Sequence, residues 1–257
     1  MANIHPIASG FYNWKETFPF VSPLVAEASS ILEELNVNVN ATLMTTQQID
    51  CQQCNIQTGI KCKTCKAEQV WRDWPETNLY KQKQGEQNQE WKVVPLCYSF
   101  PADDEKNTVW VDANEKRFPQ TCALLRSIPG IRTALFSRLG PKTSLVSHQG
   151  WAQLSNHVLR CHISLSLPVS SPVLEHNSND SFSGHPPCGI IVGEEIQYHE
   201  MGNVIVFDDS LLHSAFNKSK ENRIVLIVDI VRPATAPKGS AEKGKTEELE
   251  AFIKEFH

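Results

Sequence analysis

The sequence lacks a long apolar run, a surplus of basic residues and an apolar leader. The longest apolar run, Ile224 to Val228, ends at Asp229, and a membrane-spanning helix needs roughly 20 apolar residues. With 24 Lys and Arg against 29 Asp and Glu, the net charge of -5 argues against a dedicated nucleic-acid-binding protein. No basic start precedes an apolar stretch, so we expect no secretory signal and a cytoplasmic location.

Eight cysteines and nine histidines make up the unusual part of the composition. Four of the cysteines, Cys51, Cys54, Cys62 and Cys65, have the spacing C-x2-C-x7-C-x2-C in a polar segment. Two such pairs can close a tetrahedral zinc site, although the spacer is shorter than is usual between zinc knuckles. In a reducing compartment the alternatives are free thiols or a surface redox pair. A structural zinc site therefore stays open beside these alternatives.

The remaining pattern predicts a mainly β protein with a few helices. Helical spacing predicts amphipathic helices over 18–35 and near the C-terminus, and a short helix over 119–131. Short β-type runs follow from residue 91 onward with no βαβ alternation, which indicates an antiparallel barrel or sandwich. We expect one domain over 1–257, with the lead-in and Cys-bearing insert at about 1–90, the β core at about 91–233 and a tail at 234–257.

The run VLRCHISLSLP alternates along its whole length. Leu159, Cys161 and Ile163 share one face with the leucines that follow them, whereas Arg160 and His162 share the other face with two serines. A polar face of this kind either points to solvent or lines the interior of a barrel that holds a polar ligand.

Two further histidines extend this pattern. His148 precedes the run, in SHQG, and His213 follows the strand-like GNVIVFDD. Arg223 begins the next strand. Neutral imidazoles bind Fe(II) and similar ions, and a buried arginine can hold an anionic co-substrate. Each histidine alone would more often be structural or at the surface, but the combination fits a non-haem iron oxygenase.

At these residues the segment from Trp74 to Pro233 resembles the aspartyl/asparaginyl β-hydroxylase family of Fe(II)/2-oxoglutarate oxygenases. The matching stretches are WPETNLY, WKVVPLCYSF, FPQTCALLRSIPGI, ALFSRLGPKTSLVSHQG, VLRCHISLSLP, GNVIVFDDSLLHSAFN and RIVLIVDIVRP. The N-terminal FPFVSPLVAEASSILEEL is similar to the family's lead-in, whereas the Cys cluster has no counterpart there. The resemblance implies a double-stranded β-helix, the cupin-like jelly roll, with flanking helices.

The resemblance also implies an iron site with two protein ligands. His148 and His213 match the family's two iron-binding histidines. Most 2-oxoglutarate oxygenases carry a carboxylate two residues after the first histidine, whereas this family, like this chain, has a glycine there, Gly150. The following Asp208 and Asp209, near His213, are either groups that orient a ligand imidazole or turn residues.

The co-substrate site is implied by four further matches. Arg223 and Ser137 match residues that bind the distal carboxylate of 2-oxoglutarate, and His162 matches one at its iron-proximal end. Arg160 matches a residue on the same wall that holds 2-oxoglutarate or a substrate carboxylate. Val158 stands where the animal enzymes carry a second arginine, a departure that counts against an Asp or Asn side chain as substrate.

The implied activity is that of a dioxygenase using Fe(II), 2-oxoglutarate and O₂. We expect hydroxylation of an unactivated C–H bond in an amino acid, a peptidyl Asp or Asn, or a related polar small molecule. The missing carboxylate ligand also leaves room for a halide, so a halogenase on the same iron site is an alternative. A hydroxylase of an acyl chain, a non-catalytic cupin-like module and a zinc interaction module built on the Cys cluster are the others.

Overall fold

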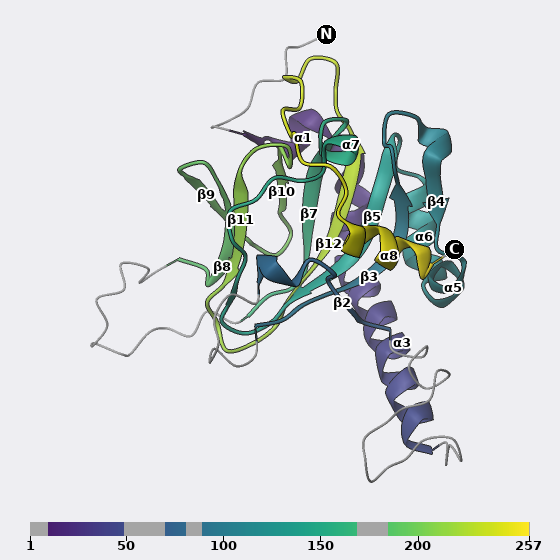
Figure 1. The fold of residues 1–257 in the computed structure, drawn as a ribbon. Helices are drawn as coiled ribbons and strands as arrows, with labels where there is room; N and C mark the ends of the chain where they lie inside the picture. The colour runs from purple at the N-terminus through teal and green to yellow at the C-terminus, as the bar shows by residue number, and fades with distance from the viewer. Residues whose placement is uncertain (1–9, 49–69, 81–88, 169–184, 257) are drawn as a thin grey trace, which may run out of the picture.

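Two antiparallel β-sheets form the body of the protein (Figure 1). The structure is a computed structural model that describes residues 10–48, 70–80, 89–168 and 185–256. The larger sheet has eight strands in the order β1-β10-β7-β12-β5-β3-β2, with β4 paired to β3. Its strands are β1 Phe11–Tyr12, β2 Arg72–Asp73, β3 Trp91–Ser99, β4 Thr108–Trp110, β5 Ile131–Leu139, β7 Val158–Ser166, β10 Val204–Phe207 and β12 Arg223–Val231.

The smaller sheet has four strands in the order β6-β11-β8-β9. Its strands are β6 Thr143–Ser144, β8 Cys188–Val192, β9 Glu195–Tyr198 and β11 His213–Asn217. One buried cluster joins residues of both sheets, among them Ile190 and Ala215 from the smaller sheet and Phe207 and Ile227 from the larger. The two sheets therefore pack face to face, and the fold is the expected double-stranded β-helix.

Helices cover the outer face of the larger sheet. The helices are α1 Trp14–Thr17, α2 Ser22–Ala26, α3 Ala28–Gln48, α5 Asp112–Arg117, α6 Pro119–Arg126, α7 Ala152–Ser155 and α8 Glu247–Lys254, with short 3-10 turns at Pro19–Val21, Thr77–Leu79 and Glu105–Asn107. In Figure 1, α3 lies behind the sheet and extends past its lower edge. Leu24, Ile31 and Leu35 pack there against strand residues such as Leu159 and Leu226. This second core lies outside the space between the sheets.

The helix expected over 18–35 is interrupted and longer. A 3-10 turn and α2 come first, and Glu27 leaves the helical region with φ -94° and ψ 11°. From Ala28 the helix continues to Gln48, beyond the predicted end. Glu34 of α3 accepts hydrogen bonds from the backbone N–H groups of Gln120 and Thr121, both at 2.9 Å, and so caps the start of α6.

Four cysteines have the buried positions that the sequence predicts. Cys97, Cys122, Cys161 and Cys188 are free thiols, each at most 1% exposed. The four cysteines of the zinc prediction lie outside the described residues, so that site stays a prediction. In the parts of the chain that the structure describes, no helix is long and apolar enough to cross a membrane.

Candidate active site between the two sheets

The polar face of β7 lines the interior of the protein. Leu159, Cys161 and Ile163 pack under the helices, whereas His162 and Ser164 on the opposite face are only 4% and 2% exposed. Both faces of the strand are therefore covered, and the alternation that the sequence shows marks a polar interior rather than a solvent-facing side.

His148 and His213 lie side by side at one end of this interior. Their ring centroids are 4.4 Å apart, and each backbone N–H donates to the other residue's carbonyl at 2.9 Å. The Nδ1 atoms contact carbonyl oxygens two residues upstream, Val146 O at 2.7 Å and Leu211 O at 2.8 Å. Because a carbonyl only accepts, both Nδ1 atoms carry the proton and both Nε2 lone pairs remain available to bind a metal.

The surroundings keep both imidazoles neutral. Burial lowers the pKa of His213 well below its ordinary value, and the neighbouring His148 lowers it further. Burial also lowers the pKa of His148, although its hydrogen bond to Val146 and the charge of Asp209 oppose the shift. Neutral imidazole is the form that binds metal ions.

Asp209 occupies the space that Gly150 leaves empty. A Cβ added to Gly150 would lie 1.9 Å from Asp209 Oδ2, and the backbone N–H of Gly150 donates to Asp209 O at 2.8 Å. The other carboxylate oxygen of Asp209 lies 3.4 Å from His213 Nε2. Oδ2 itself is buried with no hydrogen-bond partner in the described part of the chain. The carboxylate thus lies beside the two imidazoles although it follows neither in an H-x-D motif.

Arg160 is held by two carboxylates. Its Nε and Nη2 donate to the two oxygens of Asp229 at 2.8 and 3.0 Å, and its Nη1 pairs with Asp209. Asp229 lies directly across from Arg160 in the register of β12 and β7. Burial raises the pKa of both carboxyl groups, and the charge of Arg160 opposes that shift. Arg160 therefore orders the acidic side of the site, and its fork is already occupied.

Arg223 lies in the interior with no anionic partner. It is 2% exposed, and among the described residues no Asp or Glu forms an ion pair with it. Its Nη1 lies 3.2 Å from His199 Nε2, and its Nε has no hydrogen-bond partner there. Burial lowers the pKa of Arg223 to about 10, so the group is charged at neutral pH. A buried, uncompensated cation is a site for an anion.

Ser137 and His162 line the same interior. Ser137 is buried on β5 opposite Val225, two residues along β12 from Arg223, and its Oγ accepts a hydrogen bond from Trp91 Nε1 at 3.0 Å. Both ring nitrogens of His162 are buried without a partner in the described residues. The ring of Phe207 lies 5.3 Å from His162 and 5.2 Å from His213, and it joins the arginine end of the interior to the histidine pair.

The interior therefore brings together all six residues that the sequence singles out for an iron and co-substrate site. Three others escaped sequence reasoning or were left undecided: His199, Asp209 and Asp229. Asp229 gave a signal, because a charge inside an apolar strand must be paired when the strand is buried. His199 gave none, since a single histidine after a short polar run predicts no location.

The donors fit a ferrous ion and a dicarboxylate. Two neutral imidazoles with free Nε2 atoms suit Fe(II), and the unpartnered Asp209 Oδ2 lies at the same place. In the residues described here, no group of three or more His, Cys, Asp and Glu side chains is arranged to hold a metal ion. A metal at this position would have two protein ligands and would take its others from smaller molecules.

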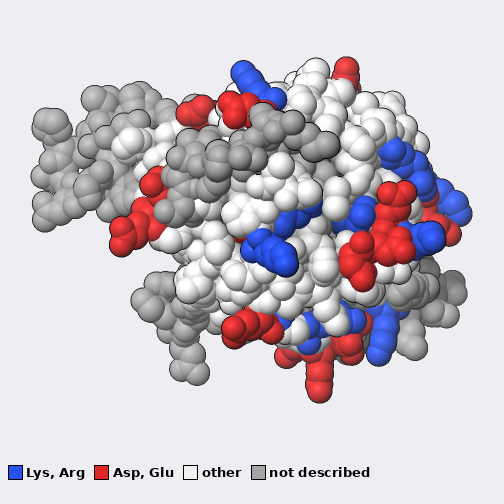
Figure 2. Space-filling model, turned by 90° about the horizontal axis from the view of Figure 1, so that it is seen from above, with Lys and Arg blue, Asp and Glu red and all other residues white. Residues whose placement is uncertain are grey.

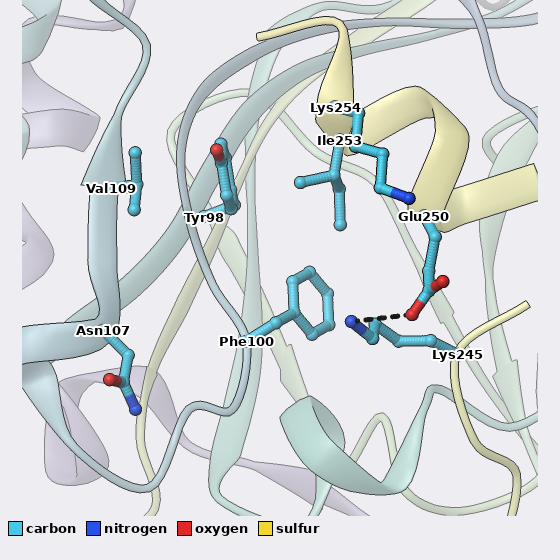
Figure 3. A pocket seen from close by; sticks show the side chains of 8 residues that line it. All are labelled: Tyr98, Phe100, Asn107, Val109, Lys245, Glu250, Ile253 and Lys254. Atoms are coloured by element: carbon cyan, nitrogen blue, oxygen red, sulfur yellow. Dashed lines mark ion pairs between the residues drawn. The ribbon is translucent and has the colours of Figure 1, made fainter. Parts of the chain in front are cut away.

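Two hollows lie outside this interior. One, of about 310 Å³, lies between α8 and the β3–β4 edge, where Lys245 pairs with Glu250 at 3.2 Å near Phe100 and Tyr98 (Figure 3). The other, of about 370 Å³, is lined by His199 together with Leu167, Cys188 and Met201. On the face seen in Figure 2, basic and acidic side chains lie interspersed around a largely uncharged centre.

Comparison with known proteins assigns a family. The sequence model described as "Aspartyl/Asparaginyl beta-hydroxylase" matches residues 62–233. An ornithine lipid ester-linked acyl 2-hydroxylase of Rhizobium tropici is 33% identical over 49% of this chain and 39% of its own length. The human aspartyl/asparaginyl beta-hydroxylase is 29% identical over 48% of this chain and 14% of its own length. The chain thus spans less than half the length of these relatives.

Solved structures show weaker similarity. A prolyl-4-hydroxylase of Pseudomonas putida covers 80% of this chain and 100% of its own at a TM-score of 0.35 and 10% identity. A 2OG-Fe(II) oxygenase family oxidoreductase of Burkholderia pseudomallei covers 60% of this chain and 73% of its own at a TM-score of 0.36 and 11% identity. At this level of similarity they say nothing about the reaction.

Proposed function

The chain belongs to the aspartyl/asparaginyl β-hydroxylase family, and from this premise we propose that it is an Fe(II)- and 2-oxoglutarate-dependent hydroxylase. The observation that carries the proposal is the enclosed interior that holds two neutral, adjacent imidazoles and a buried arginine without a counter-ion. One feature suits a ferrous ion and the other suits the free carboxylate of a co-substrate chelated to it.

The residues have separate roles in this proposal. His148 and His213 would hold iron through Nε2, while Arg223 and Ser137 would bind the distal carboxylate of 2-oxoglutarate. His162 would contact the inner end of the co-substrate. When bound, iron and 2-oxoglutarate supply the oxidising chemistry, in which O₂ is consumed, succinate and CO₂ leave, and a C–H bond of the substrate becomes C–OH. The protein positions these groups and keeps bulk water out.

Asp209 would act on the metal position without being supplied by an H-x-D motif. Its buried Oδ2 can accept a hydrogen bond from a water bound beside His213. The same carboxylate counts against the halogenase alternative, because it fills the space beside Gly150 where a halide would have to lie. A chloride placed there would meet a carboxylate and no free cation, since the Arg160 fork is already paired.

The substrate class remains part of the proposal. The sequence predicts an amino acid, a peptidyl Asp or Asn, or a polar small molecule, and a relative that is named an acyl 2-hydroxylase adds a lipid acyl chain. Arg160 bears on this choice because Asp229 and Asp209 take up its three donor nitrogens. A substrate carboxylate would have to displace one of them, which favours an uncharged group next to the reacting carbon.

Anaerobic titration tests the proposal. Adding Fe(II) and then 2-oxoglutarate to the full chain should produce the weak visible charge-transfer band of a chelated 2-oxoacid, and His213→Ala should abolish it. His157→Ala, which removes a histidine outside the site, should retain it. Absence of the band in the wild-type protein contradicts the proposal, and its survival in His213→Ala contradicts the ligand assignment. A succinate-production screen over amino acids, peptides and acyl lipids then identifies the substrate.

A further inference from the structure

We propose that His199 is a positioning residue for Arg223, whose guanidinium it holds in place for a dicarboxylate co-substrate. The hydrogen bond from Arg223 Nη1 to His199 Nε2, at 3.2 Å, is the contact through which it acts. The inference rests on the proposed function and adds to it a residue that neither the sequence pattern nor the family resemblance singled out.

The imidazole of His199 is fixed on three sides. Its residue directly follows β9, and its backbone N–H donates to Cys188 O at 3.0 Å. Its ring stacks on that of His162, with centroids 5.6 Å apart and planes 6° from parallel. The side chain is 1% exposed. An acceptor held this rigidly restricts the rotamers of the long arginine side chain that donates to it.

The contact also fixes the tautomer of His199. An arginine nitrogen can only donate, so Nε2 must be the acceptor and Nδ1 must carry the proton. Nδ1 is buried and has no hydrogen-bond partner among the residues described. Burial and the charge of Arg223 both lower the pKa of His199 well below its ordinary value, which agrees with a neutral ring.

A neutral acceptor is what an anion-binding arginine requires. The interior contains two buried arginines that differ in this respect: carboxylates hold Arg160 and take up its charge, whereas an uncharged imidazole holds Arg223. A carboxylate in place of His199 would orient the guanidinium but would also compete with the incoming co-substrate. The imidazole orients it and leaves its full charge for the ligand.

Calorimetry with a redox-inert metal measures this effect apart from turnover. The full chain is loaded with Mn(II) and titrated with 2-oxoglutarate, for wild type, His199→Leu and His199→Gln. Leucine removes the acceptor yet fills the space toward the hollow lined by Leu167 and Cys188, whereas glutamine can present an oxygen near the position of Nε2. We expect His199→Leu to weaken 2-oxoglutarate binding roughly tenfold and His199→Gln to restore most of the loss. Mn(II) affinity, read by electron paramagnetic resonance, should stay unchanged.

A double-mutant cycle tests whether the effect acts through Arg223. In an Arg223→Lys background, where the fork that His199 holds is gone, His199→Leu should add little further loss. Equal binding by wild type and His199→Leu overturns the inference, and so does a parallel fall in Mn(II) affinity or in unfolding temperature that glutamine does not rescue. If His199→Leu does not fold, His199→Ala is measured in the same way. Failure of the wild-type protein to bind 2-oxoglutarate overturns the proposed function itself, and this inference with it.

Discussion

The single missing side chain of Gly150 controls where the carboxylate of Asp209 lies. Gly150→Ala places a Cβ 1.9 Å from Asp209 Oδ2, so the carboxylate must move away from the histidine pair. We expect Gly150→Ala to lower the free energy of unfolding by about 1–3 kcal/mol, as overpacking does, and to weaken Fe(II) binding in an anaerobic titration.

Gly244→Ala is the matched control for this substitution. Gly244 has no atom within 4 Å of an added Cβ and no positive φ, so its stability and Fe(II) affinity should match the wild type. Equal behaviour of the two alanine variants would show that Asp209 has room to move and that Gly150 is not required by the site.

Asp229 is the main partner of the buried Arg160. Asp229→Ala removes two charge-assisted hydrogen bonds and leaves the guanidinium with Asp209 alone. Breaking a buried ion pair on one side costs about 3–5 kcal/mol, and we expect a loss of this size in urea unfolding. Glu242→Ala, an exposed acidic residue, serves as the control and should change stability by less than about 0.5 kcal/mol. A comparably small change in Asp229→Ala would mean that Asp209 alone compensates Arg160.

Residue types and a family resemblance are enough to name His148, His213 and Arg223, but not to show how they are supported. Residue identity indicates which chemistry a side chain can do, whereas its partner depends on which strands lie next to each other. Asp229 and Arg160 are 69 residues apart in sequence and meet only because β12 pairs with β7. The contact of His199 with Arg223 depends on the smaller sheet packing over the larger, which no local pattern encodes.

At the scale of elements, α8 anchors the tail against the aromatic side of the core. Thr246 caps the helix by accepting from Leu249 N–H at 3.3 Å, Leu249 is 3% exposed, and the ring of Phe252 lies 6.3 Å from that of Trp74. Trp74 in turn stacks on Trp91, the donor to Ser137.

Leu249→Ala should therefore destabilise the whole protein. Truncating a buried leucine costs about 2–5 kcal/mol, measurable by chemical denaturation. Val37→Ala on α3, where the side chain is 59% exposed, is the control and should stay within about 0.5 kcal/mol of wild type. A small loss in Leu249→Ala, combined with altered tryptophan fluorescence, would indicate that α8 detaches locally without affecting the folding of the sheets.

Element prediction succeeded where one face was uniformly apolar and failed where the pattern was mixed. The long strands β3, β5, β7 and β12 all lie within predicted runs. The strand β9 was missed, because EIQY is half exposed at the edge of the smaller sheet and carries little hydrophobic periodicity. The N-terminal helix is interrupted because Pro19 and Pro23 each begin a new turn.

At the scale of the whole molecule, the sequence indicates an antiparallel barrel or sandwich but not its pairing. Strand lengths and turns follow from local chemistry, whereas the order β1-β10-β7-β12-β5-β3-β2 joins segments from both ends of the chain. The family resemblance supplied this topology. The division into a lead-in, a β core and a tail over 1–257 stays a prediction.

The enclosed interior makes the stability of the whole protein depend on pH. Four of its histidines are buried, and burial lowers the pKa of each: His148, His162, His199 and His213. In the unfolded chain these groups take up protons as the pH falls through their ordinary value of about 6.5, while in the folded protein they resist protonation to lower pH. The unfolded state then binds more protons, so the free energy of unfolding falls as the pH falls.

We therefore expect the metal-free protein to lose stability as the pH drops from about 7 toward 5.5, with each such histidine contributing up to about 1.4 kcal/mol per pH unit. Asp209 and Asp229 act in the opposite direction, because burial raises their pKa. Comparing His199→Gln with wild type cancels their contribution, and the variant should show the shallower dependence in urea unfolding at a series of pH values. His157→Gln, outside the interior, should leave the dependence unchanged. Parallel curves for wild type and His199→Gln would mean that water reaches His199 and that the space between the sheets is not closed at its arginine end.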